Sequence, residues 1–358
     1  MTSRLSRLRA ALKEAACQAA LVWNPANVRY LSGFTGTEGT LLVTERDAWF
    51  LTDSRYTEQA GDQVTPHGFS VVTFRQKFKE IAGKLRELGV AELGVEDETM
   101  TVSQHRQLAE DAGPVTLRPL GRLITRLREI KDASEIAAIR KAVQVQEAAL
   151  RTILPLIQPG VTERGIAFAL DTEMRRLGAS DVSFATIVAS GPRGAMPHGT
   201  ASDKVIAAGE LIVIDWGCIV DGYCSDQTVT LAVGEPLDPD AKKVYQVVYE
   251  AQQACLAAGK PGYEFPALDR VPREIIEQAG FGAMFGHGTG HALGLEIHEE
   301  PRVSPLGSGA AEVGMVFTIE PGIYLPGRFG VRLEDIVLVT ETGLEKLTTL
   351  PKEWRSMV

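Results

Sequence analysis

The first third of the chain alternates short apolar runs with amphipathic segments. Leu5, Leu8 and Leu12 recur at helical spacing within 3–17, which predicts a helix there. Further helices are expected near 76–88 and 103–112. Runs rich in β-branched and aromatic residues predict strands at 19–23, 40–44, 47–52, 69–74, 92–97 and 114–119. Strands that alternate with helices indicate an α/β sandwich domain.

Two features mark helix starts and a domain boundary. Asp53 and Ser54 are residue types that cap helices, so a helix carrying Arg55 and Tyr56 is expected to begin there. The chain becomes strongly charged near 125–132. This change places a boundary that divides the protein into domains of residues 1–128 and 129–358.

The second domain has a different pattern. A long helix is expected at 134–157, ended by the turn residues at 158–160, and another at 162–177. Beyond residue 183 the apolar runs predict strands, interrupted by two helices within 238–279. Strands around a helical layer indicate an α+β domain.

Composition narrows the classes of function. The 358 residues are enough for two domains, and 44% hydrophobic with 23% charged residues is an ordinary soluble balance. A net charge of −9 argues against a nucleic-acid partner. No apolar run approaches the roughly 20 residues of a membrane span. The N-terminus lacks a signal peptide's apolar centre, and the four cysteines form no CxxC pair, so a reduced, cytoplasmic setting is expected.

Histidines gather in one glycine-rich stretch, 286–301. Three of the protein's six, His287, His291 and His298, lie within it, and His198 lies in a separate MPHG segment. Imidazole is a common metal ligand and proton carrier near neutral pH. The stretch is either a solvated loop or part of a site, and the carboxylates elsewhere in the chain favour the site.

Asp215 and Asp226 belong to a predicted hairpin. Asp221-Gly222 between them is a strong two-residue turn signal. With that loop, both acids lie on one face as diagonal neighbours about 7–8 Å apart at the backbone. Two acids on such an apolar strand face repel each other unless cations lie between them. The alternative is a pair of exposed acids at a sheet edge.

Glu320 and Glu334 repeat this arrangement. They are symmetric about Gly327, so a three-residue loop at 326–328 would place them opposite each other. Four carboxylates and one imidazole form a ligand set for two divalent ions. Oxygen-rich coordination suits Mn²⁺, and Zn²⁺ or Co²⁺ would also fit. The expected chemistry is hydrolysis of an amide-like bond, with the oxyanion of the intermediate stabilised at the site.

Taken together, these segments resemble the pita-bread metallopeptidases, the family of methionine aminopeptidases, Xaa-Pro aminopeptidases and Xaa-Pro dipeptidases. The matching motifs are MPHG at 196–199, IDWGCIVDGYCSD at 214–226, HGTGHALGLEIHE at 287–299, TIEPGIY at 318–324 and VRLEDIVLV at 331–339. The resemblance implies that the metal ligands are Asp215, Asp226, His291, Glu320 and Glu334. Asp226 and Glu334 would bridge the two ions.

The same resemblance implies roles for the remaining residues. His198 and His298 match the pair that hydrogen-bonds the substrate carbonyl and the tetrahedral intermediate. His287 matches a histidine that lines the proline pocket. Tyr324 and Arg332 are candidate substrate-binding residues, with simple packing as the alternative, and Arg332 could also orient a ligand carboxylate. Glu320 is a candidate proton shuttle as well as a ligand.

The first domain resembles the N-terminal domain of Xaa-Pro aminopeptidases through NVRYLSGFTGTEGTLLVT and TDSRYTEQA. The resemblance implies a homodimer or higher homo-oligomer formed through this domain. The glycine loop 33–39 would reach a neighbouring active site or be an ordinary turn. Arg55 and Trp23 are either substrate contacts or structural residues. The leading interpretation is an Xaa-Pro aminopeptidase acting on proline-containing peptides.

Alternatives remain open. The chain is short, like small bacterial Xaa-Pro dipeptidases, so a dipeptidase is the alternative activity. A creatinase-type amidinohydrolase would lack the metal ligands, and a non-catalytic binding protein would have lost some of them. Val229 stands where the family often has Arg, which puts in doubt a salt bridge at that strand.

Overall fold

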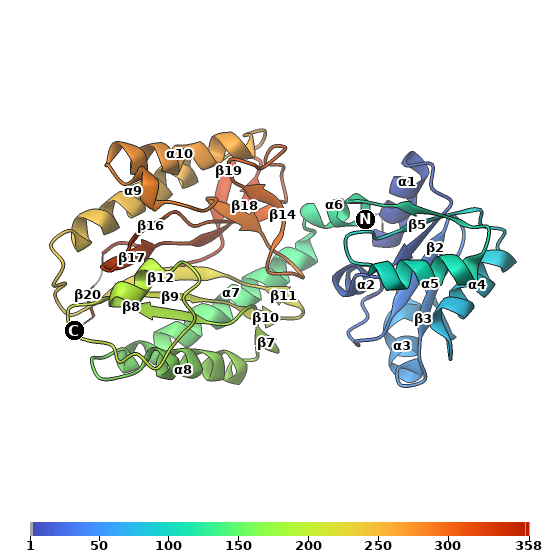
Figure 1. Ribbon diagram of the computed structural model, residues 1–358, viewed down its shortest axis with the longest axis horizontal. Coiled ribbons are helices and arrows are strands. Elements are labelled where there is room, and N and C mark those ends of the chain that lie inside the picture. Colours follow the sequence, from blue (N-terminus) through green and yellow to red (C-terminus); the bar gives the residue numbers. More distant parts are fainter. Residues whose placement is uncertain (1–2, 355, 358) are drawn as a thin grey trace. The chain divides into compact units, whose positions relative to one another are not determined.

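The computed structural model describes residues 3–354 and 356–357. The chain divides into two compact units, Met1–Arg128 and Glu129–Val358 (Figure 1).

The first unit is built on one mixed sheet with the strand order β4-β3-β2-β1-β5-β6. Its elements are α1 (Arg4–Glu14), β1 (Ala19–Val22), α2 (Pro25–Ser32), β2 (Thr40–Thr44), β3 (Ala48–Thr52), α3 (Thr57–Val64), β4 (Ser70–Thr73), α4 (Lys77–Glu87), β5 (Glu92–Val95), α5 (Val102–Ala112), β6 (Thr116–Pro119) and α6 (Leu123–Glu129). The strands predicted at 40–44 and 47–52 are confirmed as β2 and β3, which pair antiparallel.

Apolar side chains of this sheet pack against α4 and α5. Leu21, Leu42 and Leu93 are fully buried with Ile81 and Leu85 of α4 in one core cluster. The α/β character predicted for this domain is therefore confirmed.

Two local predictions for the first unit need revision. Asp53 does not cap α3, which begins at Thr57 without a side-chain cap. Its carboxylate instead accepts from the backbone N–H of Arg55 and pairs with the Arg55 guanidinium, 2.7 Å away. Sequence reasoning also assigned no element to 25–32, which forms α2, capped by the side chain of Asn24.

The second unit places strands between two helix pairs. Its elements are α7 (Ala133–Ile153), α8 (Glu163–Arg176), β7 (Asp181–Val182), β8 (Ile187–Ser190), β9 (Leu211–Trp216), β10 (Cys218–Val220), β11 (Tyr223–Cys224), β12 (Gln227–Val233), α9 (Ala241–Ala258), α10 (Phe265–Gln278), β13 (Gly290–Ala292), β14 (Glu299–Val303), β15 (Val316–Ile319), β16 (Gly322–Leu325), β17 (Phe329–Arg332), β18 (Asp335–Thr340), β19 (Gly343–Lys346) and β20 (Ser356–Met357). In Figure 1, β8, β9, β12, β16 and β17 lie between the α7–α8 pair and the α9–α10 pair.

Two core clusters hold these layers together. One joins α7 and α8 to β8, β9 and β12 through residues such as Leu150, Leu170 and Ile214. The other joins α9 to β16 and β17 through Val244, Val248 and Ile323. The strands of these two clusters, β8, β9, β12, β16 and β17, are buried on both faces. A polar side chain there needs a specific partner.

The long helix is shorter than predicted. α7 ends at Ile153, and a 3-10 turn at 154–156 follows. Pro155 explains the difference, because proline lacks the N–H that an α-helix needs and its ring clashes with the preceding turn. Among the residues that the structure describes, no helix combines the length and apolar character needed to cross a membrane.

Candidate metal centre

The hairpin that carries the two aspartates has the predicted register. Asp221 and Gly222 have φ of 52° and 89°, the positive values that a two-residue turn of this kind requires. Val220 pairs with Tyr223, and the same register continues to place Thr228 opposite Asp215. Asp215 and Asp226 therefore share one face, and the prediction is confirmed.

The second hairpin is confirmed in the same way. Leu325 pairs with Phe329 around a three-residue loop. Ile319 pairs with Asp335 in β15 and β18, which continue the register of β16 and β17. In this shared register Glu320 is opposite Glu334, in the gaps between β15 and β16 and between β17 and β18.

The structure brings Asp226, His291 and Glu334 together, with one potential ligand atom of each within 4.8 Å of the others. His291 Nε2 lies 3.5 Å from Oδ2 of Asp226 and 3.6 Å from Oε1 of Glu320. Asp215 belongs to the same group, because its charge raises the pKa of Asp226 after the larger effect of burial. All five proposed ligands therefore converge from separate segments of the second unit.

The ring of His291 is oriented as in a metal-binding histidine. Its Nδ1 lies 3.1 Å from the carbonyl oxygen of Ala292, which can only accept, so Nδ1 carries the proton. Nε2 is then left with a lone pair directed at the carboxylates. A second ring nitrogen held by a carbonyl is the usual support of a metal-binding histidine.

The carboxylates themselves are under-satisfied. Within the described residues, the buried Oδ1 atoms of Asp215 and Asp226 have no hydrogen-bond partner. Burial raises the pKa of Asp215, Asp226 and Glu334, and neighbouring carboxylates add to the rise for each of them. Buried carboxylate oxygens without hydrogen-bond donors are costly unless a cation compensates their charge. Together with the lone pair of the imidazole, they form a group that suits divalent cations.

Arg332 and Tyr324 connect this centre to His287. Arg332 donates to Oδ2 of Asp215 at 2.6 Å and to the Tyr324 hydroxyl at 3.0 Å. The hydroxyl lies 2.9 Å from Nε2 of His287, whose Nδ1 is 2.7 Å from the carbonyl of Gly288. That carbonyl fixes the proton on Nδ1, so Tyr324 donates to Nε2. The contact between Arg332 and Asp215 is the kind that would orient a ligand carboxylate.

His298 and His198 are exposed, unlike the proposed ligands. The His298 ring lies 4.4 Å from the His291 ring. The pKa of His298 is lowered, first by partial burial and then by the charges of His291 and His198. His298 therefore lies on the solvent side of His291, beside the buried carboxylates.

Sequence reasoning missed the residues that support these groups. Thr228 donates to Oε2 of Glu334 at 2.8 Å, and its position opposite Asp215 was the available signal. On α10, Asp269 accepts from the Thr289 N–H, and Arg273 donates to the carbonyl of His287. No sequence pattern indicated that this helix holds the histidine loop.

Val229, at the position where the family often has arginine, packs as an apolar residue. It is buried within the apolar cluster formed by α7, α8 and their strands. Side chains alternate between the faces of a strand. The neighbouring Thr228 therefore lies on the opposite face, where its hydroxyl contacts Glu334 and Arg332.

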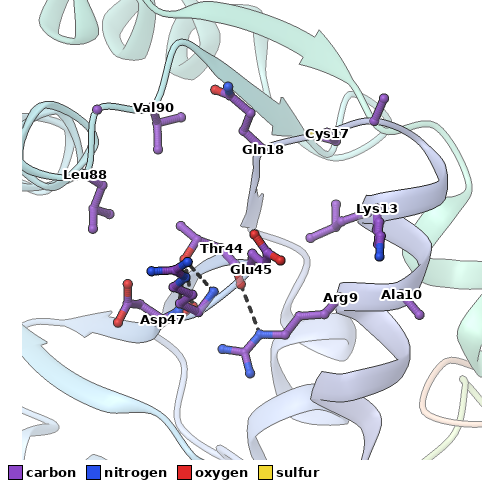
Figure 2. Close-up of a pocket in the computed structure, with 14 residues that line it drawn as sticks. Arg9, Ala10, Lys13, Cys17, Gln18, Thr44, Glu45, Asp47, Leu88 and Val90 are labelled. Atoms are coloured by element: carbon purple, nitrogen blue, oxygen red, sulfur yellow. Dashed lines mark hydrogen bonds between the residues drawn. The ribbon is translucent and has the colours of Figure 1, made fainter.

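A different pocket lies in the first unit (Figure 2). It has a volume of about 710 Å³ and runs between α1, the β2–β3 turn and the end of α4. Arg9, Lys13 and Cys17 line it, and Arg9 Nε donates to the carbonyl of Thr44 at 3.0 Å. Its described lining includes none of the candidate site residues.

A pita-bread fold that encloses several carboxylates, two of them with an unsatisfied buried oxygen, beside an oriented imidazole is typical of metal-dependent hydrolases. Residues 137–341 match the model of metallopeptidase family M24, and residues 4–130 match the creatinase/prolidase N-terminal domain. The chain belongs to metallopeptidase family M24, and the expected α/β plus pita-bread fold class is confirmed.

Similar proteins cover the chain from end to end. The Xaa-Pro dipeptidase of Pyrococcus furiosus is 37% identical over 99% of both chains. The solved structure of the Xaa-Pro dipeptidase from Bacillus anthracis is 42% identical, covers 99% of both chains and has a TM-score of 0.96. That of the X-Pro aminopeptidase from Thermotoga maritima is 38% identical, with the same coverage and a TM-score of 0.91.

Proposed function

We propose that this metallopeptidase is an Xaa-Pro dipeptidase that hydrolyses the bond between an N-terminal residue and a C-terminal proline. The convergence of four carboxylates with the lone pair of His291 is the observation that carries the hydrolytic part. Full-length similarity to proteins named Xaa-Pro dipeptidases supports the substrate class. This choice departs from the aminopeptidase interpretation of the sequence, which the relatives support less well.

Asp215, Asp226, His291, Glu320 and Glu334 are the proposed ligands of two divalent ions, with Mn²⁺ as the expected metal. When bound, such ions activate water and neutralise the developing oxyanion. Asp226 and Glu334 are the proposed bridges. Their burial between two hairpins excludes bulk water and strengthens every charge interaction at the centre.

The surrounding residues have separate proposed tasks. His298 and His198 donate N–H groups to the substrate carbonyl and to the oxyanion that forms from it. Glu320 accepts the proton of the attacking water and passes it to the leaving proline nitrogen. His287, held by Tyr324, lines the side of the site where the proline ring binds.

The aminopeptidase remains the second candidate, because the Thermotoga maritima structure carries that name. Rates on Xaa-Pro and Xaa-Pro-Xaa peptides with added Mn²⁺ separate the two. We expect turnover of the dipeptide and little of the longer peptide. Equal rates on both would restore the aminopeptidase, and no turnover of either would refute the Xaa-Pro assignment.

The homo-oligomer expected through the first domain remains a prediction. Light scattering on the purified chain measures its mass directly. A mass of one chain would refute it.

A further inference from the structure

The segment after β19 is fixed in place by buried polar groups. Glu147 of α7 accepts from the N–H and hydroxyl of Thr349 and, at 2.9 Å, from the N–H of Leu350. Tyr245 of α9 donates to the carbonyl of Lys352 at 2.9 Å. Beyond this point β20 pairs in parallel with β12. The backbone around Lys352 is therefore held from both helix layers.

The Lys352 side chain is buried, with 1% of its surface exposed. Its Nζ donates to the carbonyl oxygen of Thr228 at 3.0 Å and lies 3.6 Å from Oδ1 of Asp335. An ammonium group loses several kcal/mol of hydration when it is buried, so it persists only where anions and acceptors replace the water. The charges of three carboxylates, Asp335, Glu334 and Glu147, act on Lys352.

Thr228 connects this ammonium to a proposed metal ligand. The carbonyl oxygen that accepts from Lys352 also accepts from the N–H of Glu334 at 3.1 Å. The hydroxyl of the same threonine donates to Oε2 of Glu334 at 2.8 Å. Asp335, the other partner of Lys352, directly follows Glu334 in the sequence. The ammonium therefore contacts the residue that hydrogen-bonds Glu334 and the residue that follows Glu334 in the sequence.

We infer that Lys352 is a positioning residue for Glu334 and supplies a positive charge behind the buried carboxylates. The inference rests on the proposed metal site. Lys352 touches none of the proposed ligands and acts through Thr228 and Asp335. Arg332 contacts Asp215 directly, whereas Lys352 acts on Glu334 through the carbonyl of Thr228 and through Asp335.

Lys346 provides a matched control. Its Nζ lies 3.3 Å from Oδ2 of the same Asp335, but 36% of its side-chain surface is exposed. Lys346→Met removes a positive charge from the same carboxylate while leaving Thr228 untouched. If the loss of a positive charge near Asp335 were enough, Mn²⁺ affinity would fall in both Lys352→Met and Lys346→Met. If Lys352 positions Glu334, Mn²⁺ affinity falls only in Lys352→Met.

The experiment is calorimetric titration of Mn²⁺ into the full chain after metal removal by a chelator. Loss of groups that orient metal ligands typically weakens metal affinity by about 10- to 100-fold, and we expect this for Lys352→Met. Lys346→Met should bind as the wild type does. At saturating Mn²⁺, the KM for an Xaa-Pro dipeptide should stay unchanged in Lys352→Met. An unchanged Mn²⁺ affinity, or an equal change in both variants, overturns the inference.

Two further variants cover the case in which Lys352→Met does not fold. Lys352→Arg keeps the charge and should retain Mn²⁺ affinity within a few-fold. Lys352→Gln can still donate to Thr228 but is neutral, and its affinity should fall. Equal affinities in these two variants overturn the role of the charge. Failure of the wild type to bind Mn²⁺ refutes the metal site itself and is distinguishable from all of these results.

Discussion

Nη2 of Arg332 lies 2.6 Å from Oδ2 of Asp215, and both side chains are buried. The same guanidinium donates to the Thr228 hydroxyl, the Tyr324 hydroxyl and the carbonyl of Pro197. One residue thus links β9, β12, β16 and the segment that carries His198. The charge of Arg332 offsets part of the repulsion among the carboxylates.

Arg332→Met should destabilise the metal-free chain strongly, because it leaves Asp215 buried without its partner. Breaking a buried pair in this way costs about 3–5 kcal/mol. The measurement is urea unfolding after metal removal. Arg328→Met is the control, since Arg328 pairs with Asp238 at 41% side-chain exposure and exposed pairs contribute at most about 1 kcal/mol. Equal losses in the two variants would contradict a special role for the buried pair.

Glu334→Gln should lose a bound metal ion and nearly all peptidase activity. The amide keeps the size of the side chain and can still contact Thr228, but it removes the charge that a bridging ligand needs. Metal content by mass spectrometry and turnover of an Xaa-Pro dipeptide are the two readouts. Glu345→Gln on β19, in an exposed pair with Arg140, should change neither. A Glu334→Gln protein with full metal content would remove Glu334 from the ligand set.

The two hairpins could be predicted because their evidence is local. Asp221-Gly222 determines a loop length, and the loop length determines which side chains share a face. The same reasoning, applied to the loop around Gly327, correctly predicts that Glu320 lies opposite Glu334. The proposed metal ligands follow from these registers together with the family resemblance.

The supporting residues could not be predicted because their partners are distant in sequence. Lys352 meets Thr228 across 124 positions, and nothing in the segment around it resembles a site. Arg273 reaches the carbonyl of His287 from a helix whose own pattern indicates only amphipathic packing. Such contacts depend on how layers pack, which hydrophobic periodicity does not specify.

His298→Ala should keep its metal while turnover falls by about 10²–10³-fold, as for removal of an oxyanion donor. His298 is exposed, and the described structure gives it a ring contact with His291 and no position among the buried ligands. Metal analysis and steady-state kinetics on the same preparation test both parts. A loss of metal would instead show that His298 supports His291 at the centre.

The stability of the protein should fall in acid partly because of His287. Burial lowers the pKa of this imidazole in the folded chain, whereas an unfolded histidine titrates near 6.5. Below pH of about 6.5 the folded state therefore binds fewer protons than the unfolded state. The contribution of neutral His287 to the free energy of unfolding is complete above this pH and is lost as the pH falls through the folded pKa. His287→Gln should flatten the acid side of the profile of unfolding free energy against pH, measured on the metal-free chain. Tyr324→Phe removes the hydroxyl but keeps His287 buried, so it should retain the wild-type slope. A steep acid side that persists in His287→Gln would assign the dependence to other groups.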